Sequence, residues 1–215
     1  MKNFYRLIQG DSFKVLSIMK DESVSLVITD PPYGINTVQK SDRFKELNYD
    51  LVINDDKTLD LSEVLRVSKN QIIFGGNFFK LPISRGWIVW DKQGGKTVDF
   101  GDCELIWTSF DKPIRIIRHI WDGFRRDSDK KLKRVHPSQK PTGLIKVLIE
   151  KFSNENDVIL DPFIGSGSTI FACQDMKRSC IGIEIDPKYC DLIKKRCFGR
   201  QFLDRKVEYK FEVFK

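Results

Sequence analysis

The sequence contains no long hydrophobic run: its 215 residues hold no stretch of about 18 consecutive apolar residues, the length that a membrane-spanning helix requires. Its first residues, 1–13, also lack the apolar core of a signal peptide. These two absences predict a cytoplasmic protein that has no membrane partner.

Residues that bind transition metals are scarce. The chain has two histidines and five cysteines, and no two cysteines form a CxxC pair. An odd number of unpaired cysteines in a cytoplasmic protein is typical of reduced thiols that pack as small hydrophobic side chains. We therefore expect no metal cofactor and no zinc site.

Positive charge exceeds negative charge and is concentrated in two stretches. The net charge is +7. Residues 112–140 hold ten Lys and Arg against three Asp, and residues 188–215 hold nine Lys and Arg against four Asp and Glu. Such clustering indicates a polyanionic partner. Solvated basic surfaces without a partner are the alternative that charge alone leaves open.

The apolar pattern predicts an α/β fold. The chain has no internal repeat, and its length suits one α/β core. Strand-like apolar runs alternate with segments of helical spacing, which indicates a mostly parallel sheet with helices on both faces. Residues 34–58, which we expect to form a loop, and residues 110–135 show neither period. The expected strands are 4–8, 25–29, 71–74, 87–90, 104–107, 158–160, 180–185 and 207–213, and the expected helices are 13–19, 59–67, 141–152, 168–176 and 189–196.

Four carboxylates follow predicted strands directly. In a parallel sheet, ligands bind at the carboxyl ends of the strands, so side chains placed there converge on one crevice. We expect such a crevice to hold Asp11, Asp30, Asp161 and Glu184.

The later of two short motifs, Asp161 to Gly167 (DPFIGSG), reads as a nucleotide cofactor loop. Glycines at 165 and 167 allow the backbone to approach a ligand closely, and the loop opens a helix whose free N–H groups face the same crevice. Glu184 ends the next strand, and a carboxylate there suits a ribose diol. A simple helix-start turn beside a surface Glu is the alternative.

Two further segments are candidates for the same pocket. Asp11 can accept a hydrogen bond from an adenine amino group, or it can cap the helix that follows Gly10. In the segment His136 to Pro141 (HPSQKP), two prolines exclude helix and fix a rigid turn that presents His136, Ser138 and Lys140 as donors. Lys140 suits a ligand carboxylate as its counter-charge, whereas a helix-entry turn is the structural alternative.

The earlier motif, Asp30-Pro31-Pro32-Tyr33 (DPPY), suits an aromatic amino group as acceptor. The lone pair of such a nitrogen is delocalised into the ring, which makes it a poor nucleophile. The Asp30 carboxylate and the Pro31 carbonyl can accept its two N–H bonds and favour a tetrahedral nitrogen, while Tyr33 offers a face for stacking. A rigid turn at a strand end is the alternative.

The motifs together resemble a known family. In chain order the sequence has IQGD (8–11), TDPPYG (29–34), RGWIVWDK (85–92), CELIWTSF (103–110), HPSQKP (136–141), LDPFIGSGST (160–169) and GIEID (182–186). This order resembles the permuted β class of S-adenosylmethionine-dependent DNA amino-methyltransferases, most of all compact phage and prophage members. The resemblance covers residues 4–197.

The resemblance implies a circularly permuted, Rossmann-like class I methyltransferase fold and a cytoplasmic setting in a bacterial or phage-infected host cell. The single domain 1–215 then comprises an acceptor half (1–109), a target-recognition insert (110–135), a cofactor half (136–200) and a C-terminal strand (201–215). Double-stranded DNA is the implied partner, a homodimer is compatible, and S-adenosylhomocysteine is the product. The implied catalytic residues are Asp30, Pro31, Pro32 and Tyr33. The implied cofactor-binding residues are Asp11, Asp30, His136, Ser138, Lys140, Asp161, Pro162, Phe163, Gly165, Ser166, Gly167, Glu184, Ile185 and Asp186.

The insert at 110–135 is short for a target-recognition region, which predicts brief or relaxed sequence specificity. Its basic side chains suit phosphate contacts, which position a duplex but do not read its sequence. Trp121 and Phe124 could stack where a base leaves the helix, or pack in the core. The candidate DNA-binding residues are Arg115, Arg118, Trp121, Arg125, Arg126, Lys130, Lys131, Lys133 and Arg134.

The expected activity is site-specific methylation of adenine N6, because Asp in the first motif is more frequent in adenine enzymes and Ser in cytosine N4 enzymes. Cytosine N4 methylation of DNA is the nearest alternative. RNA adenine enzymes with this motif order carry DPPW, and protein glutamine enzymes carry Asn in place of Asp after their cofactor loop. A non-catalytic DNA-binding subunit of a methyltransferase complex is an alternative of another class.

Overall fold

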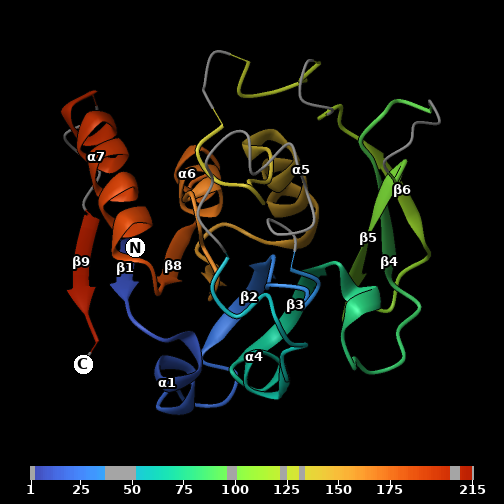
Figure 1. The fold of residues 1–215 in the computed structure, drawn as a ribbon, viewed down its shortest axis with the longest axis horizontal. Coiled ribbons are helices and arrows are strands. Elements are labelled where there is room, and N and C mark those ends of the chain that lie inside the picture. Colours follow the sequence, from blue (N-terminus) through green and yellow to red (C-terminus); the bar gives the residue numbers. More distant parts are fainter. Residues whose placement is uncertain are drawn as a thin grey trace.

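The computed structural model describes residues 3–36, 52–95, 101–121, 125–130, 134–203 and 209–214. Figure 1 shows a central sheet flanked by helices. The helices are α1 (Ser12–Ser17), α4 (Ser62–Arg66), α5 (Thr142–Phe152), α6 (Ser168–Asp175) and α7 (Pro187–Leu203), with the 3-10 turn η1 (Gly76–Phe78). The strands are β1 (Tyr5–Gln9), β2 (Val24–Thr29), β3 (Ser68–Phe74), β4 (Trp87–Asp91), β5 (Cys103–Thr108), β6 (Arg115–Arg118), β7 (Val158–Asp161), β8 (Ser179–Glu184) and β9 (Tyr209–Val213).

The described strands form one nine-stranded sheet in the order β6-β4-β5-β3-β2-β7-β8-β1-β9. Strand β5 runs antiparallel to both of its neighbours, and the remaining pairs are parallel. The two motif-bearing strands, β2 and β7, are direct neighbours, with Leu26 opposite Ile159. The DPPY and DPFIGSG motifs therefore lie side by side at the centre of the sheet, although the chain separates them by more than a hundred residues.

Helices cover the two faces of this sheet, because successive residues of its central strands point to opposite sides. Leu26 and Ile28 of β2 belong to one core with α5, α6 and α7, whereas Val27 belongs to a second core with α1 and α4. Figure 1 shows α5, α6 and α7 on one side of the strands and α1 and α4 on the other. The predicted mostly parallel, Rossmann-like α/β fold is thus confirmed.

The structure differs from the expected elements in three places. Residues 110–135, predicted to be irregular, contain the edge strand β6, whose four side chains are mostly exposed. The last helix continues to Leu203 rather than ending near 196, and α4 is shorter than predicted. Much of the expected loop 34–58, residues 37–51, lies outside the described residues. No described helix has the length and apolarity needed to cross a membrane.

Candidate active site

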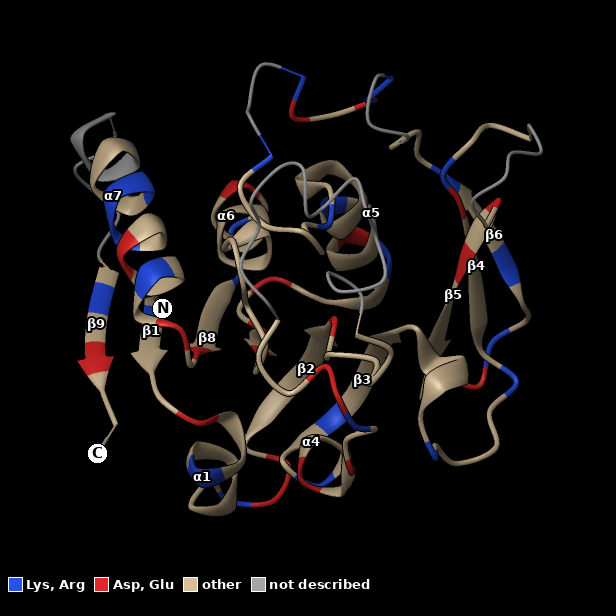
Figure 2. Cartoon of the chain, in the orientation of Figure 1, with Lys and Arg blue, Asp and Glu red and all other residues tan. Residues whose placement is uncertain are grey.

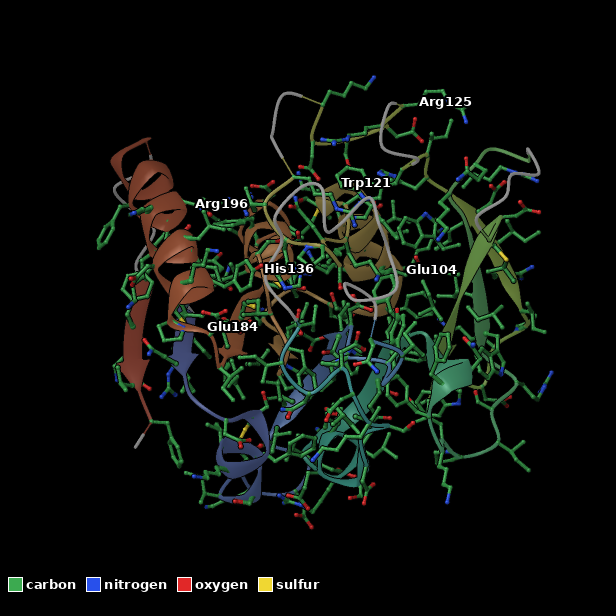
Figure 3. The ribbon with its side chains drawn as sticks, in the orientation of Figure 1. Glu104, Trp121, Arg125, His136, Glu184 and Arg196 are labelled. Carbon is green, nitrogen blue, oxygen red and sulfur yellow. The ribbon has the colours of Figure 1, made fainter. Side chains whose placement is uncertain are left out.

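A single cavity of about 490 Å³ opens at the carboxyl ends of the central strands. Its wall includes both motifs, so that residues on the acceptor loop and on the cofactor loop face one space. Figure 3 shows Glu184 and Glu104 toward opposite sides of His136 in this region. The expected convergence of strand-end carboxylates is observed: the cavity is lined by Asp11, Asp30, Asp161 and Glu184.

The cofactor loop between β7 and α6 needs its glycines. Gly165 and Gly167 have φ angles of 52° and 85°, a left-handed conformation that a Cβ atom disfavours. A Cβ at Gly167 would also lie 3.0 Å from Ile193 and Phe171. The N–H of Ile164 donates to the carbonyl of Ile183 in β8, which fixes the loop against the neighbouring strand.

Asp161 holds the cofactor loop in place through hydrogen bonds. Its carboxylate is buried and accepts hydrogen bonds from Thr29 (2.8 Å), Thr169 (2.6 Å) and the N–H of Phe163 (3.1 Å). Burial raises the pKa of Asp161 to about 6, against the lowering effect of these hydrogen bonds. Asp161 therefore joins β2, β7 and α6 through these hydrogen bonds.

Glu184 ends β8 beside the loop. Its Oε2 accepts from the N–H of Gly165 (2.8 Å), and its Oε1 accepts from the N–H of Asp186 (2.9 Å). Each carboxylate oxygen keeps a further lone pair for a ligand hydroxyl. Burial raises the pKa of Glu184 to about 7, partly offset by the two N–H donors. The carboxylate thus lies within the cavity wall, together with Ile185 and Asp186.

Asp11 caps α1, which is the structural alternative that its sequence position left open. Its Oδ1 accepts from the N–H of Phe13 (2.8 Å) and of Lys14 (3.5 Å). The next residue, Ser12, donates to the carbonyl of Pro162 and so ties this cap to the cofactor loop. Because Asp11 also lines the cavity, capping and ligand binding are compatible.

The HPSQKP turn lines the cavity from His136 to Lys140. Burial lowers the pKa of His136 to about 3, and the cations Arg134 and Lys140 add to this effect, so the imidazole is neutral at pH 7. Its Nδ1 accepts from the N–H of Ser138 (3.1 Å), which leaves Nε2 as the protonated nitrogen. The ring packs against Tyr189 at 4.4 Å between centroids.

The acceptor loop carries its carboxylate in a tight ionic contact. The hydroxyl of Tyr33 donates to Oδ1 of Asp30 (2.6 Å), and Nζ of Lys140 lies 2.6 Å from Oδ2. Burial raises the pKa of Asp30, and the Lys140 ammonium opposes this rise. Lys140 therefore contacts the acceptor side of the cavity, whereas the sequence placed it against a ligand carboxylate on the cofactor side.

Tyr33 lies against a glycine that permits its close approach. Its ring stacks on Phe78 at 4.7 Å with an interplanar angle of 12°. Gly75 has a φ of 63°, and a Cβ there would lie 2.4 Å from the Tyr33 ring. Such a distance is far below van der Waals contact, so no larger residue fits without moving Tyr33.

We expect Gly75→Ala to displace Tyr33 and to lower the rate of group transfer by at least about tenfold, because misplacement of a positioning group is costly. Cofactor affinity, measured by calorimetry, should remain near that of the wild type. Gly95→Ala is the matched control, since Gly95 also has a positive φ but has open space where its Cβ would lie. Equal effects of the two substitutions would show that backbone strain, rather than the position of Tyr33, matters.

Three polar residues of the site were not identified from the sequence. Glu104 and Lys92 line the cavity and form an ion pair at 3.0 Å. The buried carboxylate of Asp55 accepts from the N–H of Gly34 at 3.0 Å and fixes the residue after the acceptor motif. Glu104 is the second residue of the antiparallel strand β5, so a carboxylate near the start of a strand, rather than after its end, was the available signal.

The predicted DNA-binding residues have different environments. Arg115 and Arg118 are exposed on β6, and Figure 2 shows basic residues there and on α7. Trp121 is only 8% exposed, packs under Arg126 at 4.9 Å, belongs to the core and also lines the cavity, so the core-packing alternative is observed. Arg134 donates to the carbonyls of His136 and Pro137.

The remaining predicted basic residues are partly described. Arg125 lies at 3.5 Å from the carbonyl of Gln93, and Lys130 is exposed. The predictions for Phe124, Lys131 and Lys133 fall outside the described residues. Among the residues described, no three His, Cys, Asp or Glu side chains are grouped to hold a metal ion.

Comparison with known proteins matches this geometry to DNA methylases. Residues 91–195 match the family model N6_N4_Mtase, described as DNA methylase. The type II methyltransferase M.HpaI of Haemophilus parainfluenzae is 29% identical over 230 residues, which cover 89% of this chain and 73% of that protein.

Two solved structures share the fold. The PvuII DNA methyltransferase, described as cytosine-N4-specific, aligns with a TM-score of 0.61 and 16% identity over 98% of this chain and 96% of its own. The complex of M1.HpyAVI with SAM aligns with a TM-score of 0.57 and 22% identity over 90% and 100% of the two chains.

Proposed function

We propose that this chain is a DNA methyltransferase of the N6/N4 family that transfers the methyl group of S-adenosylmethionine to the N6 amino group of an adenine in double-stranded DNA. The observation that carries the proposal is the single cavity shared by the acceptor loop and the cofactor loop. A methyl donor and an amino acceptor must meet in one space for direct transfer.

S-adenosylmethionine is the cofactor, and it supplies an electrophilic methyl group on its sulfonium when bound. The residues present fit such a ligand: Glu184 offers carboxylate lone pairs for a ribose diol, and Gly165 leaves room beside it. The neutral His136 and the Ser138 turn face the same space. We include in this proposal each of the cofactor-binding residues predicted from the sequence, from Asp11 to Asp186.

Asp30 is the proposed acceptor of an N–H of the target base. A carboxylate hydrogen bond to the amino nitrogen favours the geometry in which its lone pair points at the methyl group. The backbone carbonyl of Pro31 is the proposed second acceptor. The ring of Pro32 fixes the φ angle that follows this carbonyl and so restricts its orientation. The Tyr33 ring is the proposed stacking surface for a base that has left the duplex.

Adenine N6 is favoured over cytosine N4 because this chain carries Asp at position 30. The PvuII enzyme, which has the same fold, is described as cytosine-N4-specific, and fold alone therefore does not separate the two substrates. Cytosine N4 methylation is the second candidate function. Membership of the permuted β class is part of the proposal and rests on motif order. A homodimer and phage origin stay predictions.

Strand β6 is the proposed start of the DNA phosphate path. Arg118 lies at the carboxyl end of β6, at the edge of the sheet where the cavity opens. We expect the double substitution Arg115→Gln with Arg118→Gln to weaken DNA binding on all sequences alike. The slope of log affinity against log salt should fall by about 0.9 per lost phosphate contact.

The control is Arg85→Gln, which removes an exposed Arg just before the amino end of the neighbouring strand β4, away from the carboxyl ends where the cavity opens. Fluorescence anisotropy with a labelled duplex at several salt concentrations measures both variants. An unchanged salt slope in the double variant would remove β6 from the DNA-binding surface.

The function is tested by incubating the protein with unmethylated genomic DNA and isotope-labelled S-adenosylmethionine, followed by mass spectrometry of the nucleosides. Labelled N6-methyladenine is the expected product, and single-molecule sequencing then gives its sites. N4-methylcytosine would establish the second candidate. Absence of both products, with S-adenosylmethionine binding intact, would favour a DNA-binding subunit.

A further inference from the structure

The acceptor carboxylate is engaged by two groups of its own protein. Asp30 accepts from Tyr33 at one oxygen and pairs with Lys140 at the other, both at 2.6 Å. The side chains of Asp30 and Lys140 are 14% and 11% exposed. An ion pair so little exposed to water is only weakly screened. An incoming amino group would therefore bind Asp30 beside an ammonium that already occupies one of its oxygens.

A second carboxylate lies on the far side of the same ammonium. Oε2 of Glu104 is 3.4 Å from Nζ of Lys140, and Oε1 of Glu104 is 3.0 Å from Nζ of Lys92. Although burial acts to raise it, the pKa of Glu104 is held below its ordinary value by these two cations. Glu104 is therefore a permanent anion at pH 7, in a cluster of two carboxylates and two ammonium groups.

We propose that Glu104 is a positioning residue of the acceptor site, which draws the Lys140 ammonium toward itself when the amino group of the base binds to Asp30. This inference rests on the proposed function and deepens it. The exchange involves hydrogen bonds only: Lys140 loses its contact with Oδ2 of Asp30 and shortens its contact with Oε2 of Glu104, and no proton changes hands. The cluster stays neutral throughout, which limits the cost of keeping four charges in a cavity wall.

The distances support this direction of exchange. Lys140 sits 0.8 Å farther from Glu104 than from Asp30, judged by its contacts of 3.4 Å and 2.6 Å, so a small movement of a flexible side chain completes the transfer. The centroids of the Tyr33 and Phe74 rings lie 5.7 Å and 5.3 Å from Nζ of Lys140. The two rings can stabilise a cation between the two carboxylates.

The test is the variant Glu104→Gln, which keeps the shape of the side chain and removes its charge. Lys140 then has one carboxylate left, so we expect single-turnover methyl transfer to slow by at least about tenfold, with S-adenosylmethionine affinity unchanged. Glu104→Asp should restore part of the rate. Glu150→Gln, an exposed change of the same kind on α5, is the control and should have the wild-type rate.

The pH profile separates this role from a structural one. The charged groups around Asp30 are Lys140 and Glu104, with Tyr33 hydrogen-bonded to it; Asp55 faces Tyr33, Lys92 faces Glu104, and Asp161 lies on the neighbouring strand end. Glu104 raises the pKa of Asp30 and Lys140 lowers it. The acid limb of the rate should therefore move to lower pH in Glu104→Gln and to higher pH in Lys140→Gln.

A double-mutant cycle completes the experiment. If Glu104 acts through Lys140, the Glu104→Gln substitution has little further effect on methyl transfer in a Lys140→Gln background. An equal loss in both backgrounds, or a wild-type rate and pH profile in Glu104→Gln, would overturn the inference. If Glu104→Gln fails to fold, Glu104→Asp, which keeps the charge but moves it away from Lys140, takes its place in the same cycle: its loss of rate should disappear in the Lys140→Gln background. Absence of methyl transfer by the wild-type protein would instead overturn the proposed function, and the inference with it.

Discussion

Replacing Asp30 with alanine is expected to reduce methyl transfer to DNA by about a thousandfold or more, while S-adenosylmethionine binding survives. Loss of one preorganised hydrogen bond to a reacting group costs about a hundredfold to a thousandfold, and here the acceptor carboxylate is lost altogether. The substitution also leaves the Lys140 ammonium beside the base, where only Glu104 balances it. Single-turnover transfer of a labelled methyl group measures the rate, and calorimetry measures cofactor affinity.

Two further variants separate the effect of the Asp30 charge from that of removing a carboxylate elsewhere. Asp30→Asn keeps the shape but removes the charge, and it should retain only a small part of the activity because an amide oxygen is a weaker acceptor. Asp111→Ala removes an exposed Asp that pairs with Arg85 on the surface, and it should behave as the wild type. A rapid rate in Asp30→Ala would mean that Asp30 is not the catalytic acceptor.

The second large effect is expected at Glu184. In Glu184→Ala, the N–H groups of Gly165 and Asp186 lose their acceptor, and the proposed hydrogen bond between the Glu184 carboxylate and the cofactor ribose is lost. A hydrogen bond to a charged group contributes about 1.5–3 kcal/mol, so the dissociation constant for S-adenosylmethionine should rise about tenfold to a hundredfold. The rate at saturating cofactor should change less.

Glu184 also predicts a pH dependence of cofactor binding. Its pKa is about 7, and ribose hydroxyls donate to its ionised form. Binding therefore favours the deprotonated carboxylate, and affinity should fall as pH drops from 8 to 6, by about tenfold. Glu184→Gln removes the titration, so its affinity should be lower at pH 8 and nearly flat across this range. A wild-type affinity that is constant over the same range would show that Glu184 does not contact the ligand.

The sequence predicted the parts of the fold in which local pattern and burial agree. Strands β2 and β7 are continuous apolar runs, because both of their faces are covered by helices. Strand β6 was missed because Arg115, Ile116 and Arg118 are exposed, and an edge strand of this kind has no buried face to produce alternation. Helix α7 was predicted too short because basic side chains interrupt its apolar spacing.

The sequence predicted the site residues that follow the ends of parallel strands. It did not predict those whose position depends on strand pairing or on a contact between distant segments. Parallel strands place Asp30, Asp161 and Glu184 together at their carboxyl ends, where ligands bind in sheets of this kind, so their position along the chain identifies them. Glu104 reaches that edge because β5 runs the other way, which depends on pairing that local sequence does not encode. The direction of Lys140 depends on a contact with a residue 110 positions earlier.

One hydrogen bond, from the hydroxyl of Thr29 to the carboxylate of Asp161, belongs to both halves of the site. Thr29 precedes the acceptor motif, and Asp161 opens the cofactor loop. A ligand that moves the end of either strand would weaken this hydrogen bond. Binding of the proposed cofactor and binding of DNA would then be linked. Linkage is reciprocal: whatever factor a bound cofactor product applies to the affinity for DNA, DNA applies to the affinity for that product. Cooperativity between the two proposed ligands would then reside in the junction between β2 and β7.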